Sequence, residues 1–333
     1  MITRICPPDK EALAFAKEEI ARGGVVAFHT ETVYGLGANA CNDEAVARIF
    51  ALKGRPADNP LIVHVHRDYD ISALVDSIPP YAKALARAYL PGPLTMVYPS
   101  KGKVSALVSC GLNTLAVRVP SSETAQAFLR EVALPIAAPS ANKSKHVSPV
   151  TAGHVYDDFH GEIPLILDGG ACSGGIESTV LDCTGDIPQI LRAGLVTREM
   201  IASVAGDCTV YHMQAGEKPK SPGMAHKHYA PKCRAVCFTE QEIDRARVCY
   251  EEEVRAGGTP YYVCERAALP LLKGNALDLG GDPAEMAARL YAVLREGERK
   301  ATLLIAIEPK ERGGVMDGVL NRFCRAFGRE HET

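Results

Sequence analysis

The sequence lacks the features of several large classes of protein. Its net charge of -3 over 333 residues provides no overall basic field for nucleic acid or for an anionic membrane. No run reaches the ~20 apolar residues of a membrane-spanning helix, and the first residues form no apolar signal segment. The 11 cysteines form no Cys-x-x-Cys pair, which favours buried thiols over a zinc site. We therefore expect a soluble, cytoplasmic protein in a reducing compartment.

Common nucleotide-binding and nucleophile motifs are missing too. No Gly-x-x-x-x-Gly-Lys-Ser/Thr occurs, which excludes a P-loop. Residues 35–40 formally fit Gly-x-Gly-x-x-Ala, but the helix that such a fingerprint must open begins only at Asn42 or Asp43. We also find no convincing Ser-His-Asp or Cys-His signature, so we expect chemistry that needs no protein nucleophile.

What is present is typical of an α/β protein with two domains. The chain is long for one domain, and short apolar strands alternate with amphipathic helices. The helices are too few to follow every strand, so we expect a mixed, twisted sheet around a concave pocket. We predict this domain over residues 1–208, a Pro- and His-rich linker over 209–232, and a smaller Rossmann-like, three-layer unit over 233–333.

The stretch from residue 24 to 66 is the most informative part of the chain. We expect a strand at Val25–Phe28, a polar loop, a helix from Asn42 or Asp43 to Lys53, and a strand at Leu61–His66. Lys53 and Arg55 flank a glycine between that helix and the second strand. The two cations form either a solvated basic loop or an anion site, since arginine and lysine both bind phosphate oxygens.

Further polar residues follow or interrupt other predicted strands. Ser140 and Asn142 follow a strand at Leu134–Pro139, and their spacing of two places them on one side of an extended chain. Arg118 interrupts an apolar strand, where it either awaits a carboxylate ligand or forms an internal salt bridge. His64 is either a structural histidine or a ligand. The glycines of residues 169–175 precede Ser178 and allow close approach of a ligand to the backbone.

Taken together, these motifs resemble the long, two-domain form of threonylcarbamoyl-AMP synthase, with a YrdC-like domain and a Rossmann-like C-terminal domain. The similarity spans nearly the whole chain. The matching segments are residues 30–37 (TETVYGLG), 53–61 (KGRPADNPL), 91–95 (PGPLT), 118–120 (RVP), 138–142 (APSAN), 177–180 (ESTV), 221–224 (SPGM) and 228–231 (HYAP). The sequence departs from the family pattern at His29, where proline is usual, and at His226, where tyrosine is usual.

The resemblance implies a nucleotidyltransferase that converts L-threonine, bicarbonate and ATP to threonylcarbamoyl-AMP and diphosphate. Mg²⁺ would accompany ATP, although the resemblance leaves its ligands unknown. The product would pass to the machinery that transfers the threonylcarbamoyl group to tRNA, without a requirement for direct tRNA binding. Positioning and charge stabilisation would account for catalysis. A lid over residues 221–231 would protect the water-sensitive intermediates.

The resemblance also implies a role for individual residues. The catalytic residues would be Lys53, Arg55, Ser140 and Asn142. The ATP site would comprise Lys53, Arg55, Asn59, Thr114, Ser140, Ser148, Arg192, His228 and Tyr229. The L-threonine site would comprise Thr32, His64, Arg118, Ala138 and Ser178, with Arg118 as the partner of the substrate carboxylate.

Two other functions compete with this one. An RNA-binding module without catalysis would need a basic surface and stacking aromatic side chains, and the near-neutral charge argues against it. An O-carbamoyltransferase-like protein would join the same domain to other catalytic modules, which this chain lacks.

Overall fold

The computed structural model describes residues 1–56, 58–212, 217 and 229–328, and its chain divides into two compact units. The first unit comprises residues 1–144, 149–173 and 177–226. The second comprises residues 145–148, 174–176 and 227–333. The segment predicted as a lid, 221–231, lies outside the described residues except for its last three positions.

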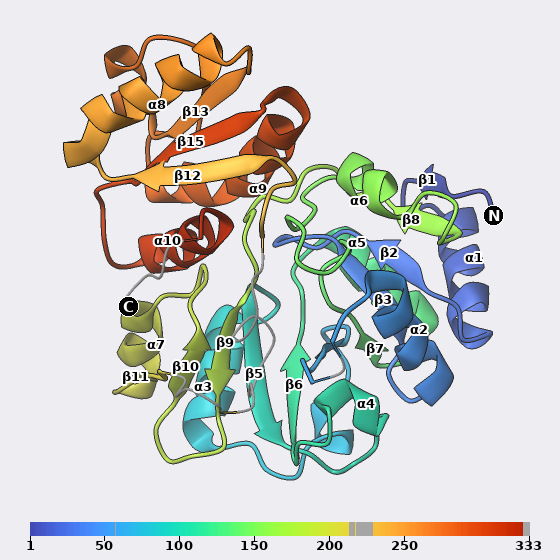
Figure 1. Cartoon of the computed structure of the whole chain (residues 1–333). Coiled ribbons are helices and arrows are strands. Elements are labelled where there is room, and N and C mark those ends of the chain that lie inside the picture. Colours follow the sequence, from blue (N-terminus) through green and yellow to red (C-terminus); the bar gives the residue numbers. More distant parts are fainter. Residues whose placement is uncertain (57, 213–216, 218–228, 329–333) are drawn as a thin grey trace. The chain divides into compact units, whose positions relative to one another are not determined.

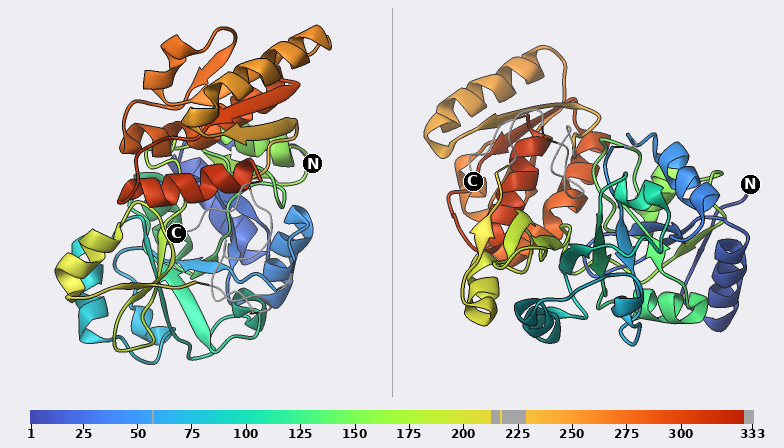
Figure 2. Two further views of the ribbon diagram at one scale, coloured as in Figure 1. Left: turned by 60° about the vertical axis from the view of Figure 1, so that its left-hand side comes forward. Right: turned by 90° about the horizontal axis from the view of Figure 1, so that it is seen from below.

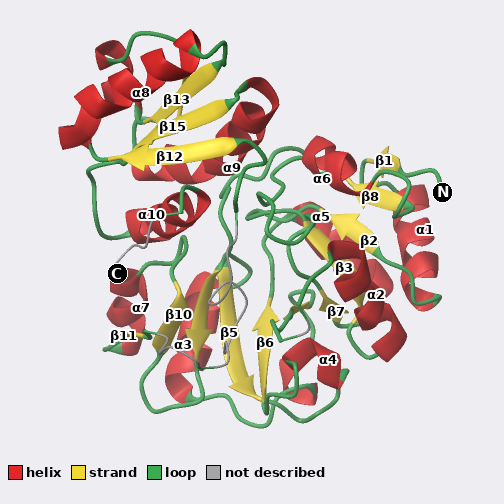
Figure 3. Cartoon of the chain, in the orientation of Figure 1, coloured by secondary structure: helices red, strands yellow, loops and turns green. Residues whose placement is uncertain are grey.

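The first unit is built on an 11-stranded sheet with strand order β1-β8-β2-β3-β7-β4-β6-β5-β9-β10-β11. Both parallel and antiparallel pairs occur in it, which confirms the predicted mixed sheet. Figure 1 shows β6, β5, β9 and β10 side by side, and Figure 3 separates helices from strands by colour. The strands are β1 (Arg4–Cys6), β2 (Val26–Phe28), β3 (Gly35–Asn39), β4 (Ile62–His64), β5 (Leu94–Pro99), β6 (Thr114–Arg118), β7 (Ile136–Ala137), β8 (Leu165–Leu167), β9 (Thr179–Asp182), β10 (Gln189–Arg192) and β11 (Thr209–Val210).

Seven helices accompany this sheet in the described part of the first unit. They are α1 (Lys10–Ala21), α2 (Asp43–Lys53), α3 (Pro80–Tyr89), α4 (Ala106–Ser109), α5 (Glu123–Val132), α6 (Ala152–Phe159) and α7 (Arg198–Ala205). One hydrophobic core cluster lies where α1 and α5 pack on β2 and β8, around fully buried aromatic rings such as those of Phe28 and Phe128. Burying such rings is a large stabilising contribution, since each removes an extensive apolar surface from water.

Helix α2 begins and ends where the sequence predicts. The side chain of Asn42 accepts a hydrogen bond from the amide of Ala45, which satisfies one of the donors at the helix N-terminus. Gly54 adopts a left-handed conformation directly after Lys53 and ends the helix. The position of Lys53 at the last turn, and therefore of the basic loop, follows from these two local signals.

Strand β3 was not predicted, because the expected polar loop between residues 29 and 41 contains it. It pairs antiparallel with both β2 and β7. A Cβ at Gly37 would lie 2.8 Å from Cγ2 of Ile136 and 2.9 Å from Cε1 of Phe28, so a side chain there would clash with the core. The glycines of this segment thus permit close packing within a sheet, and the residues that fit the dinucleotide fingerprint form a strand.

The second unit contains a parallel four-stranded sheet with strand order β12-β15-β13-β14 and helices on both faces (Figure 2). This confirms a three-layer α/β unit; the short strand β14 was not predicted. No helix in the described ranges is long and apolar enough to cross a membrane. The elements are β12 (Arg234–Phe238), α8 (Ile243–Arg255), β13 (Pro260–Cys264), β14 (Ala276–Asp278), α9 (Pro283–Lys300), β15 (Leu303–Ile307) and α10 (Val315–Ala326).

Residues 145–148 belong to the second unit although they lie in the N-terminal half of the sequence. The ring of His146 is hydrogen-bonded to the buried carboxylate of Glu298 on α9, with Nε2–oxygen distances of 2.9 and 3.0 Å. Arg295, one turn earlier on α9, donates a hydrogen bond to the carbonyl of Val147. Helix α9 therefore fixes this segment with both a side-chain pair and a main-chain contact.

Candidate active site

Three neighbouring strands of the first sheet, β4, β6 and β5, align polar side chains in one row. In the register of the sheet, His64 on β4 pairs with Arg118 on β6, Arg118 pairs with Thr95 on β5, and Thr95 pairs with Val180 on β9. Ser178 lies just before β9, and its Oγ is 2.7 Å from Oγ1 of Thr95. All these polar groups are buried, so the sheet gathers them at a single location away from bulk water.

Arg118 is fixed from several sides. Its terminal nitrogens donate to Oε1 of Glu31 and to Oγ1 of Thr32, each at 2.8 Å, and Nε donates to the carbonyl of Gly92 at 3.4 Å. Arg118 and Glu31 are 4% and 9% exposed, so this is a buried ion pair. Of the two alternatives that the sequence leaves open, the structure therefore contains the internal salt bridge.

The carboxyl group of Glu31 is ionised in this pair. Burial by itself raises its pKa, but the charge of Arg118 and the hydrogen bond from it, together with nearby backbone N–H groups, hold the pKa below its usual value. Glu31 thus places a negative charge directly against the positive charge of Arg118.

The hydroxyl of Thr32 has a fixed hydrogen-bond direction. Thr30 donates its hydroxyl proton to the carbonyl of Val33 at 2.6 Å, so at the 2.9 Å contact between the two hydroxyls Thr32 must be the donor. Oγ1 of Thr32 also accepts from Arg118. Oγ1 of Thr32 can therefore take part in a further hydrogen bond only as the acceptor, which suits an ammonium or hydroxyl group of a ligand.

His64 is a neutral imidazole. Complete burial, followed by the charge of Arg118, lowers its pKa from 6.5 to about 3. Its Nδ1 lies 3.1 Å from the carbonyl of Ile62, and its ring meets that of Phe28 edge to face at 5.9 Å. His64 can therefore position a ligand by shape and hydrogen bonding, but it contributes no positive charge near neutral pH.

A second arginine lies behind Ser178. Arg192 on β10 donates to the carbonyl of Ser178 through Nε and a terminal nitrogen, at 3.1 and 3.0 Å, and to its Oγ at 3.2 Å. These contacts fix both the backbone and the hydroxyl of Ser178. The sequence predicted both residues for a ligand site but gave no indication that one holds the other.

The structure brings Lys53 together with Ser140 and Asn142. Nζ of Lys53 donates to the backbone carbonyls of both residues, and Oγ of Ser140 donates to Oδ1 of Asn142 at 2.6 Å. Ser140 also forms an isolated β-bridge with Gly35 next to β3. Lys53, Ser140 and Asn142 thus form one buried or half-buried cluster of donors.

Arg55 contacts its own loop. It donates to the carbonyls of Asn59 and Pro60 at 3.1 and 3.0 Å. The side chain of Asn59 is 1% exposed, and its amide nitrogen and oxygen have no hydrogen-bond partner among the described residues. An unsatisfied buried amide is costly, which indicates that Asn59 is placed for a ligand or a water molecule.

The remaining predicted residues lie at various places in the two units. Thr114 begins β6 and is half-buried, and Ala138 is buried after β7, where its amide donates to the carbonyl of Ile62 at 2.9 Å. Ser148 and Tyr229 are buried in the second unit, and Tyr229 stacks on Tyr291 with a centroid distance of 5.4 Å. His228 and His226 lie outside the described residues. His29 is buried, with Nδ1 2.7 Å from Oγ of Ser122.

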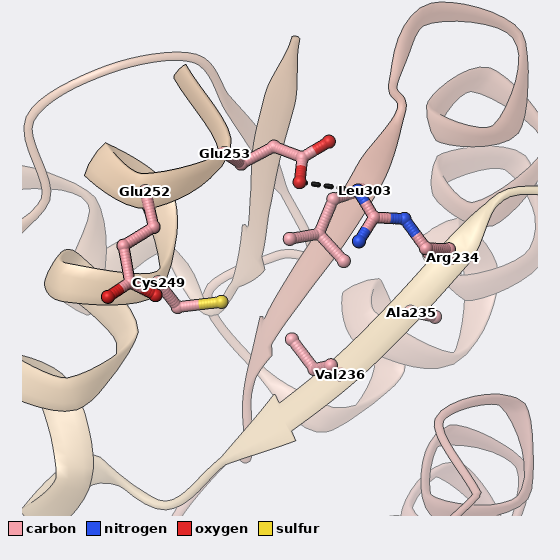
Figure 4. A pocket seen from close by; sticks show the side chains of 7 residues that line it. All are labelled: Arg234, Ala235, Val236, Cys249, Glu252, Glu253 and Leu303. Carbon is pink, nitrogen blue, oxygen red and sulfur yellow. Dashed lines mark hydrogen bonds and ion pairs between the residues drawn. The ribbon is translucent and has the colours of Figure 1, made fainter. Parts of the chain in front are cut away.

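A separate cavity of about 620 Å³ lies in the second unit, at the amino ends of β12 and β15 (Figure 4). The carboxylate of Glu253 faces it, but one oxygen accepts from Arg234 and the other from Thr302. Ligands of open α/β sheets bind at the opposite, carboxyl ends of the strands. We therefore do not regard this cavity as the functional site.

Comparisons with known proteins decide the family. A model described as telomere recombination matches residues 18–194, and one described as the threonylcarbamoyl-AMP synthase C-terminal domain matches residues 196–328. A threonylcarbamoyl-AMP synthase from Pyrococcus abyssi is 39% identical over 318 residues, which cover 93% of this chain and 92% of the relative. One from Bacillus subtilis is 40% identical over 326 residues, which cover 95% and 93%. The chain belongs to the threonylcarbamoyl-AMP synthase family.

A solved structure agrees with the threonylcarbamoyl-AMP synthase family assignment. The crystal structure of P. abyssi Sua5 complexed with L-threonine superposes with a TM-score of 0.89 at 36% identity, covering 98% of this chain and 97% of that one. The predicted two-domain form and fold class are thereby confirmed.

Sequence reasoning did not assign two residues of this site to a role. Glu31 and Thr95 lie in two of the segments that resemble the family, 30–37 and 91–95, but the sequence assigned neither to the site. Each contacts a residue that the resemblance to threonylcarbamoyl-AMP synthases places at the amino acid, namely Arg118 and Ser178 respectively. The alternation of β5 could have suggested Thr95, whereas no local signal connects Glu31 with a strand 87 positions further along.

Proposed function

We propose that this chain converts L-threonine, bicarbonate and ATP to threonylcarbamoyl-AMP and diphosphate. The observation that carries the proposal is the buried polar row on β4, β6 and β5, which Ser178 continues just before β9, in a fold shared with a relative that binds L-threonine. A buried arginine, an acceptor hydroxyl and a neutral histidine together suit the charges and hydrogen bonds of a small hydroxylated amino acid.

The row would hold the amino acid. Arg118 would bind its carboxylate, while Thr32, His64, Ala138 and Ser178 complete this end of the site. The amine and bicarbonate would form an N-carboxylate with loss of water, and one oxygen of this N-carboxylate would attack the α-phosphate of ATP and release diphosphate. No residue of the protein needs to form a covalent bond, so the catalytic contribution is orientation and charge stabilisation.

The donor cluster would hold the nucleotide. Lys53 and Arg55 would meet the phosphates, with Ser140 and Asn142 closing the catalytic group. Asn59, whose amide has no partner in the described structure, supports a ligand at this end. Thr114, Ser148, Arg192, His228 and Tyr229 would complete the ATP site.

Mg²⁺ would enter with ATP and neutralise the charge of the leaving diphosphate. The described residues contain no group of three or more His, Cys, Asp or Glu side chains that could hold a metal ion. The protein donors near the proposed phosphates are instead cations and amides, which fit phosphate oxygens rather than a metal ion. The ion would therefore be held mainly by the phosphates themselves.

The product would pass to the machinery that modifies tRNA, and the reaction would take place in the cytoplasm. All 11 cysteines lie in the described ranges as free thiols, which suits a reducing compartment. A non-catalytic RNA-binding role is not favoured, because the relatives that cover most of the chain are named as synthases.

A diphosphate-release assay tests the proposal. We expect release from ATP that requires both L-threonine and bicarbonate. Lys53→Ala should lower the rate by about 100-fold or more, as is usual when a charge-stabilising donor is lost. Arg48→Ala, which removes an exposed cation from the same helix, is the matched control and should leave the rate unchanged. Release that ignores threonine, or that survives Lys53→Ala, would refute the proposed function.

A further inference from the structure

At the amino-acid end of the site, the arginine that would bind the substrate carboxylate is already paired with a buried glutamate. Arg118 would suffice to attract a carboxylate, yet the charge of Arg118 is already opposed by Glu31 at 2.8 Å, within the buried part of the molecule. A carboxylate ligand thus approaches a pair whose charges cancel, and not an isolated cation.

The pair leaves Arg118 able to bind a ligand. Its hydrogen bonds to Glu31, Thr32 and the carbonyl of Gly92 use fewer N–H donors than a guanidinium has. A substrate carboxylate can therefore bind without displacing Glu31. Glu31 then remains in the occupied site as a fixed negative charge.

Two titratable neighbours, His64 and Cys172, do not replace this charge. His64 is neutral, and the pKa of the Cys172 thiol is raised by burial and by Glu31, so it is also neutral. Arg192 donates a hydrogen bond to Oγ of Ser178, and its charge is positive. Glu31 is thus the carboxylate that directly contacts the substrate-binding arginine.

We infer that Glu31 is a specificity-determining residue that makes the site select a zwitterionic amino acid over an anionic acid of the same shape. This inference rests on the proposed function for the identity of the substrate. A zwitterion brings no net charge into the buried site, and its ammonium group is attracted by Glu31 and donates a hydrogen bond to Oγ1 of Thr32. The 2-hydroxy analogue of L-threonine carries a net negative charge. Glu31 repels its carboxylate, and the analogue has no ammonium group that Glu31 could attract in compensation.

Direct binding to the full chain tests this inference. Calorimetry would measure the affinities for L-threonine and for its 2-hydroxy analogue in the wild type and in Glu31→Gln, Glu31→Asp and Glu131→Gln. We expect the wild type to prefer L-threonine, and Glu31→Gln to shrink that preference by about tenfold or more, since a unit charge nearby is removed in a poorly screened site. Glu31→Asp should weaken both ligands through lost positioning of Arg118 while keeping the preference.

Glu131→Gln is the matched control, because it removes the same charge from an exposed pair with Lys17 and should change neither affinity. Equal weakening of both ligands in Glu31→Gln would reduce Glu31 to a structural support of Arg118 and overturn the inference. A wild type that binds neither ligand, or binds both equally, would overturn it as well. A wild type that prefers L-threonine but releases no diphosphate would refute the proposed function and leave the selectivity standing.

Discussion

Acidification should destabilise the first unit through His64. The pKa of this histidine is lowered to about 3 in the folded protein, against 6.5 in the unfolded chain. Because the unfolded state binds the proton first, stability is present above about pH 6.5 and is lost as the pH falls from there towards 3. Between pH 7 and about pH 4.5, linkage gives a loss of roughly 2.5 kcal/mol from this group.

The test compares the wild type with His64→Asn, which cannot titrate and retains a side-chain N–H for the carbonyl of Ile62. The chain has no tryptophan, so hydrogen exchange of peptides from β4 and β6 is a suitable measure of the local opening free energy. The variant should be less stable at neutral pH because it leaves a small cavity, but its stability should fall less on acidification, by roughly 2.5 kcal/mol. Equal losses in both proteins would show that His64 is protonated in the folded state or does not titrate in this range, which would refute the argument.

Three further substitutions have outcomes set by single contacts. Gly37→Ala should lower the free energy of unfolding, measured with urea, by about 1–3 kcal/mol, because the new Cβ would overlap Ile136. Thr95→Val keeps the volume but removes the hydroxyl partner of Ser178, so steady-state kinetics should show a higher KM for L-threonine and an unchanged KM for ATP. Glu298→Gln removes the buried negative charge opposite His146, so hydrogen exchange in residues 145–148 should accelerate by about tenfold or more; unchanged exchange would show that the pair does not hold this segment.

The sequence predicted those parts of the fold that depend on local signals. Helix α2 could be bounded because Asn42 and Gly54 are explicit start and stop residues. Strand β3 could not be predicted from its own residues, since its glycines are typical of a loop. It is a strand because it pairs with β2 and β7, and its glycines are needed there because Phe28 and Ile136 leave no room for a Cβ at Gly37.

The same distinction between local and long-range information applies to the site. The strand pattern around Arg118 shows that a buried cation needs a partner, but not which one. Glu31 reaches Arg118 because the loop after β2 packs against the end of β6. This packing depends on the order of strands in the whole sheet, so local sequence does not reveal it. Likewise, Ser140 and Asn142 could be recognised as a pair from their spacing, whereas the donation from Lys53 to their carbonyls depends on the approach of a helix that ends 87 residues before Ser140.

The order of strands in the first sheet also has a consequence for how the chain is made. Strands β1 and β2 pair with β8, whose residues are about 140 to 160 positions later in the sequence. On the ribosome, these early strands emerge long before their partner, with their apolar side chains exposed in the nascent chain. Pairing across such distances is slow, and exposed strand edges favour aggregation. Production of the protein should therefore depend more on chaperones and on translation speed than its ordinary composition suggests.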